Sequence, residues 1–288
     1  MEFLDALLEY NFLQKALLTS VMVGIICGIV GSFIILRGMS LMGDAISHAV
    51  LPGVAISYML GINFFFGAIF TGLLTAIGIG FISQNSRIKH DTSIGIMFTA
   101  AFALGIILIT LLKSSTDLYH ILFGNVLAVR TTDMWITLIV GVIVIGAIYF
   151  LYKELLLTSF DPTIAMAYGL PKNLIHYILM TLLTMATVAS LQTVGIVLVV
   201  AMLITPAATA YLITDRLSTM ITLSAIIGAC SSIIGLYFSF IYNLASGAAI
   251  VVVATAIFLL AFFLSPKHGL LWRSFRSKAN SISIKKEM

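Results

Sequence analysis

An aspartate and a histidine stand four residues apart in the segment 40–53 of a strongly apolar chain. On a helix this spacing would place the side chains of Asp44 and His48 on one face, about 6 Å apart along the axis. Ionisable groups at membrane depth cost about 2.5–3.5 kcal/mol each on insertion scales, so they commonly mark a functional site. A carboxylate and an imidazole together can ligate a divalent metal ion. The pattern predicts a transport or metal site, and a hydrogen-bonded pair inside a helix bundle stays open as the alternative.

Two ligands are too few to hold a metal ion in such surroundings. A symmetric dimer would supply four, because each copy brings one Asp44 and one His48 to the two-fold axis. Ser47 lies beside the pair in the sequence and could add a hydroxyl or hold a water molecule. Ligation requires a neutral imidazole, so we expect metal uptake to fall as the pH drops below the range in which histidine is neutral.

The composition predicts an all-α, polytopic membrane protein. The chain is 61% hydrophobic and 9% charged, with a mean hydropathy of +1.16. The apolar runs are continuous rather than alternating, which excludes a membrane β-barrel. Nine runs predict membrane segments at 13–36, 42–60, 63–83, 92–113, 133–152, 173–191, 193–213, 217–242 and 244–264. An eight-pass arrangement stays open, because the run 42–60 contains polar residues and has to face protein or a cavity.

The basic residues orient the predicted segments in the membrane. If the C-terminal tail is cytoplasmic, all but Lys15, Lys113 and Arg130 of the 15 Lys and Arg residues fall on the inner side. This bias predicts an extracellular N-terminus at 1–12 and a transmembrane domain at 13–264. Within that domain it predicts a cytoplasmic loop at 153–172, and after it a basic cytoplasmic tail at 265–288.

The cytoplasmic loop contains the signals of a short helix. Asp161 can cap its start, Pro162 suits its first turn, and Gly169 can end it. The apolar residues Ala165 and Tyr168 would share one flank with Ile164. The helix is either a simple connector or a docking element for a partner protein.

A proline interrupts the apolar run 193–213. Pro206 frees a backbone carbonyl, which Thr205 or Thr209 could satisfy. The resulting kink would line a pore, form a hinge or serve packing alone. The chain has no P-loop motif for ATP and no His-Glu-x-x-His motif, so we expect a transport subunit rather than an enzyme.

Several segments together resemble the membrane subunits of ABC importers for manganese, zinc and iron. The segment 40–53 is similar to the signature of that family, and the similarity continues at 91–98, 122–125, 194–210 and 246–251. The form His-Ala-Val-Leu-Pro-Gly, which begins at His48, is most similar to the manganese permeases of Gram-positive bacteria.

The resemblance implies more than the residues do. It implies a fold like that of the cobalamin permease, a homodimer in the bacterial cytoplasmic membrane, two cytoplasmic ATP-binding subunits and an extracellular metal-binding lipoprotein, without a nucleic-acid partner. ATP hydrolysis would occur on the separate partner chains. The metal ligands would be Asp44 and His48, and a coupling helix would lie at 161–170. No permanent cofactor is implied, since Mn²⁺, or alternatively Zn²⁺ or Fe²⁺, is the transported substrate.

Two other functions compete with this reading. A proton-coupled secondary metal transporter would use the Asp44–His48 pair to carry protons. An intramembrane hydrolase would use His48 as a base, but the sequence offers no convincing nucleophile for it.

Overall fold

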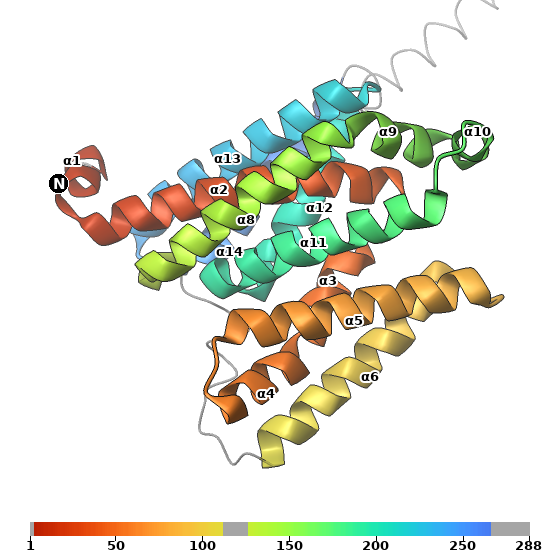
Figure 1. Cartoon of the computed structure of the whole chain (residues 1–288). Coiled ribbons are helices and arrows are strands. Elements are labelled where there is room, and N and C mark those ends of the chain that lie inside the picture. Colours follow the sequence, from red (N-terminus) through yellow and green to blue (C-terminus); the bar gives the residue numbers. More distant parts are fainter. Residues whose placement is uncertain (1–2, 112–125, 266–288) are drawn as a thin grey trace, which may run out of the picture.

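The apolar runs form long helices. A computed structural model describes residues 3–111 and 126–265, and in these ranges the chain is helical throughout apart from short connections (Figure 1). The first half contains α1 (Phe3–Glu9), α2 (Asn11–Leu36), α3 (Leu41–Ala49), α4 (Leu51–Leu60), α5 (Phe64–Asn85) and α6 (His90–Leu111). The second half contains the 3₁₀ turn η1 (Val126–Ala128), α8 (Thr131–Phe150), α9 (Tyr152–Phe160), α10 (Pro162–Ala167), α11 (Lys172–Val194), α12 (Ile196–Ile213), α13 (Leu217–Tyr242) and α14 (Ser246–Leu264).

Eight of the described helices are long and apolar enough to cross a membrane, namely α2, α5, α6, α8, α11, α12, α13 and α14. Their ends gather at two opposite ends of the bundle. At the first, here called the Arg37 end, Arg37 contacts the last turn of α9, and the rings of His90 and His176 lie 6.2 Å apart. At the second, the Lys15 end, the Lys15 ammonium donates to the hydroxyl of Thr131 over 2.8 Å.

The length of the run 42–60 suggested one membrane helix. The run instead forms the two short helices α3 and α4. They meet at Val50, just before Pro52, which has no N–H to donate to the carbonyl one turn earlier. Because α2 finishes at the Arg37 end and α5 starts at the Lys15 end, α3 and α4 together lead from one end to the other (Figure 1). Together with the eight long helices, the pair α3 and α4 makes a ninth, broken passage through the bundle, in which neither helix alone is long enough to cross a membrane.

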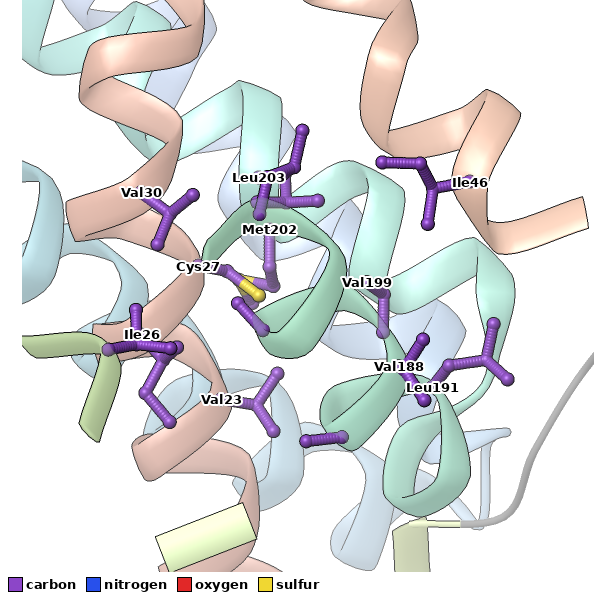
Figure 2. Close-up of a cluster of buried hydrophobic side chains, with 14 of the residues drawn as sticks. Val23, Ile26, Cys27, Val30, Ile46, Val188, Leu191, Val199, Met202 and Leu203 are labelled. Atoms are coloured by element: carbon purple, nitrogen blue, oxygen red, sulfur yellow. The ribbon is translucent and has the colours of Figure 1, made fainter. Parts of the chain in front are cut away.

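Helix α2 forms the centre of the bundle. It packs so closely on α13 that Gly24 and Gly228 face each other backbone to backbone, and the hydroxyl of Ser224 donates to the Gly28 carbonyl over 2.7 Å. Small residues allow such close approach between membrane helices. On its other side, α2 meets α11 and α12 in an apolar cluster that contains Cys27, Val188 and Met202 (Figure 2).

Helix α3 lies against this cluster with one face only. Ile46 points toward it from α3 (Figure 2), and the Leu203 side chain of α12 contacts Gly43. Met42, Ala45 and Ala49 are also buried. The opposite face of α3, which carries Asp44 and His48, is left partly open.

The segments predicted to lie outside the membrane also contain helices. The N-terminal segment 1–12 contains α1, whose Phe3 ring packs edge-on against Tyr237 of α13. The loop 153–172, which the sequence predicts to be cytoplasmic, is largely helical, since it contains most of α9 and all of α10. The tail 265–288 lies outside the described residues except for Ser265.

Candidate functional site

Asp44 and His48 come together as their spacing predicts. The Nε2 atom of His48 lies 3.5 Å from the Oδ1 atom of Asp44, one turn away on α3. This distance is too long for a good hydrogen bond, so the two groups are not locked to each other. The side chains are 23% and 46% exposed, respectively, and are therefore accessible from outside the chain. Two ligands in adjacent positions around one metal ion stand about 3 Å apart, so a small adjustment would let both bind the same ion.

Two phenylalanines of α6 enclose the imidazole. The ring centres of Phe98 and Phe102 each lie 5.5 Å from that of His48, in edge-on arrangements of 60° and 87°. The Nδ1 atom of His48 is buried without a hydrogen-bond partner in the described part of the chain. The ring is thus held by apolar contacts on one side, while Nε2 is directed toward Asp44. Local sequence patterns do not assign Phe98 and Phe102 to the site, although their four-residue spacing places both on one face of α6.

The pair in one chain is too few ligands to hold a metal ion by itself. Among the described residues, no group of three or more His, Cys, Asp or Glu side chains is close enough to hold an ion. To hold a metal ion, the pair on α3 would need further ligands from water or from another chain.

The three residues predicted to line a pore have different surroundings. Ser47 is fully buried, and its hydroxyl donates to the Gly43 carbonyl over 2.8 Å. Pro206 is buried within α12, which stays helical across it, and Thr205 is half-buried. The Thr209 hydroxyl donates to the Thr205 carbonyl over 2.7 Å rather than to the carbonyl that Pro206 frees, which belongs to Met202. A pore-lining role for these residues stays a prediction.

The predicted short helix in the loop is present as α10. The Asp161 carboxylate accepts hydrogen bonds of 2.9 Å from the backbone N–H groups of Thr163 and Ile164, and Pro162 occupies the first turn. Gly169 ends the helix with a φ of +76°, a left-handed conformation that glycine adopts without strain.

Ile164, Ala165 and Tyr168 were expected to share one flank of α10, but their exposure differs. Ala165 is fully buried, whereas Ile164, Met166 and Tyr168 are exposed to 46%, 54% and 78%. Ile164 and Tyr168 thus share one exposed flank of α10, whereas Met166 is exposed on the opposite flank. Helix α10 presents an apolar surface at the Arg37 end, next to α9 and α11.

Comparison with known proteins gives a consistent result. The sequence pattern of the ABC 3 transport family matches residues 9–265. The chain is 67% identical over 276 residues to the manganese transport system membrane protein MntC of Listeria monocytogenes, covering 96% of this chain and 99% of that protein. It is 56% identical over 275 residues to the manganese import system permease protein ScaB of Streptococcus gordonii, with 96% and 99% covered.

Two solved structures share the fold. PsaBC from Streptococcus pneumoniae, solved in complex with a Fab, superposes with a TM-score of 0.84 at 57% identity, covering 92% of this chain and 96% of that one. A metal-chelate type ABC transporter in an inward-facing conformation superposes with a TM-score of 0.69 at 16% identity, covering 87% and 85%. The second similarity concerns the fold alone.

Proposed function

Because the chain belongs to the ABC 3 transport family and is the membrane permease subunit of a bacterial manganese importer, we propose that the imported ion passes beside Asp44 and His48. It is a multi-pass protein of the plasma membrane and not an enzyme. Because the family consists of ABC transport proteins, we no longer consider a proton-coupled transporter or an intramembrane hydrolase as the function of this chain.

The geometry of α3 is the observation that supports this site. A carboxylate oxygen and an imidazole nitrogen lie 3.5 Å apart on the open face of α3, and both are partly exposed. In a homodimer with this face toward the two-fold axis, two chains supply four ligands to one ion. Water completes the coordination of a divalent ion that prefers six ligands.

The ligand types alone do not select manganese. Nitrogen and oxygen ligands bind Zn²⁺ more tightly than Mn²⁺ at equal exposure, in line with the general order of metal affinities. We propose that selection comes from delivery by an extracellular metal-binding lipoprotein and from the geometry of the dimeric site.

The apolar surface of α10 supports a docking role toward two cytoplasmic ATP-binding subunits. Ile164 and Tyr168, one turn apart, form this surface, and Asp161 and Gly169 fix the two ends of the helix. A short, capped helix with exposed apolar side chains suits insertion into a groove of a partner protein. ATP-driven movement of the partners would then displace α10 and open the Asp44–His48 site toward the cytoplasm.

Removal of either proposed ligand tests the site. In vesicles that contain the complete importer, we expect Asp44→Ala and His48→Ala to abolish Mn²⁺ uptake, while the complex assembles and reaches the membrane as usual. Asp91→Ala removes an exposed carboxylate at the start of α6 and is the matched control, expected to transport normally. Normal uptake by both ligand variants would refute the proposal.

A further inference from the structure

Arg37 is a half-buried cation whose two hydrogen-bond partners are neutral hydroxyls. Its Nε atom donates to the Ser159 hydroxyl over 2.9 Å, and its Nη2 atom donates to the Thr158 hydroxyl over 2.7 Å. Within the described residues, no carboxylate lies within 4.0 Å of it. Burial lowers the pKa of Arg37 to about 10, so the side chain stays protonated at neutral pH. Partial burial of a charge that has no counter-ion among the described residues costs solvation free energy, so the two hydroxyl acceptors are needed to offset it.

The two hydroxyl acceptors are themselves fixed. Thr158 donates its hydroxyl hydrogen to the Glu154 carbonyl over 2.7 Å, and Ser159 donates to the Leu155 carbonyl over 2.6 Å. Each oxygen is therefore held in place on the last turn of α9 while it accepts from the arginine. A planar guanidinium that bonds two adjacent acceptors forms a stiff connection, which a lysine could not reproduce.

On the other side of this connection, a rigid turn leads to the metal site. Arg37 ends α2, Gly38 adopts a φ of +66°, and the N–H of Met39 donates to the Ile34 carbonyl over 3.0 Å. These features define a Schellman turn, in which a left-handed glycine and a bond back across the helix end fix the direction of the chain. Met39 is buried, and α3 with Asp44 begins directly after Ser40. Because this turn is fixed and short, a displacement of Arg37 would move the start of α3 with it.

At the α9 side, the same connection lies next to the coupling helix. Phe160 alone separates Ser159 from Asp161, whose carboxylate caps α10. Arg37 therefore joins the last turn before α10 to the turn before α3.

We infer that Arg37 is a positioning residue that transmits movement of α10 to the Asp44–His48 site through the hydroxyls of Thr158 and Ser159. The inference rests on the proposed function, since it assumes that α10 receives the force of ATP hydrolysis. Without the connection, the partner subunits would still hydrolyse ATP, but α3 would follow α10 less closely. Coupling between two sites typically changes the binding affinity at one of them by about 5–150-fold.

The test compares Mn²⁺ uptake with ATP hydrolysis in the same vesicles, which contain the complete importer. For Arg37→Gln we expect assembled complexes that hydrolyse ATP, with a fall of about tenfold or more in ions imported per ATP. Arg37→Lys should fall between this variant and wild type. The double variant Thr158→Val/Ser159→Ala should match Arg37→Gln, and combining all three changes should add nothing further. Arg87→Gln, which removes an exposed cation at the same end, is the control and should keep the wild-type ratio.

The outcomes separate this inference from the proposed function. A wild-type ratio of ions per ATP in assembled Arg37→Gln complexes would overturn the role of Arg37 alone. A loss of uptake and hydrolysis in equal proportion, or a failure to assemble in both Arg37→Gln and Thr158→Val/Ser159→Ala, would show that Arg37 serves structure only and would also overturn it. Normal uptake by Asp44→Ala, measured in the same series, would instead reject the ion pathway itself.

Discussion

The aromatic wall around His48 predicts a graded loss of metal affinity. Phe98 and Phe102 hold the imidazole edge-on, each at 5.5 Å between ring centres, and this orients Nε2 toward Asp44. An edge contact between aromatic rings contributes about 0.5–1.5 kcal/mol beyond the burial of area. Phe102→Leu keeps most of the apolar volume but removes one such contact, so we expect the productive orientation of the ring to lose about 1 kcal/mol.

In the proposed dimer this effect would double, because both copies of His48 would bind the same ion. A loss of roughly 2 kcal/mol corresponds to a Kd for Mn²⁺ that rises about thirtyfold. The assay is competition between the purified complex and a fluorescent metal indicator, with uptake in vesicles measured in parallel. Phe66→Leu alters a phenylalanine of α5 that is 67% exposed, and it should leave the Kd unchanged. An unchanged Kd in the combined variant Phe98→Leu/Phe102→Leu would refute the idea that these rings orient the ligand.

Two further predictions concern the scaffold. Gly228→Val places a side chain against the Gly24 backbone of α2, so we expect a loss of about 1–3 kcal/mol and a lower Tm of the solubilised protein, whereas Gly146→Val, where a Cβ meets open space, should shift the Tm far less. Asp161→Ala removes the two N–H bonds at the start of α10, worth about 1 kcal/mol, and should weaken co-purification of the ATP-binding subunits about fivefold, while Asp161→Asn retains an acceptor and should not. Equal behaviour of each variant and its control would contradict the respective prediction.

Local patterns in the sequence predict the helices of this protein better than the contacts between distant segments. The apolar runs indicate the long helices, and the Asp161, Pro162 and Gly169 signals correctly predict α10, since caps and turns depend on residues a few positions apart. The four-residue spacing of Asp44 and His48 likewise brings the pair together on α3. The break at Val50 was harder to place, because Pro52 marks a helix start and an apolar run also favours continuation.

Contacts between distant segments could not be predicted in this way. Phe98 and Phe102 meet His48 only after α6 packs against α3, and Arg37 meets Thr158 only after α2 packs against α9. Tertiary packing selects these partners, and one sequence contains no periodicity that reports it. The two proposed ligands could therefore be identified in the sequence, whereas the groups that contact them and the proposed connection to α10 could not.

The incomplete site in one chain has a mechanistic consequence. A carboxylate and an imidazole from a single chain bind a divalent ion weakly, whereas four ligands from two chains in the proposed dimer bind it strongly. A small rotation of the two chains relative to each other thus changes the affinity greatly without altering either Asp44 or His48. A transporter needs such a change, because an ion held with equal affinity in both states would shift no equilibrium between them. In the proposed mechanism, Arg37 supplies the stiff link through which the partner subunits control that rotation at α3.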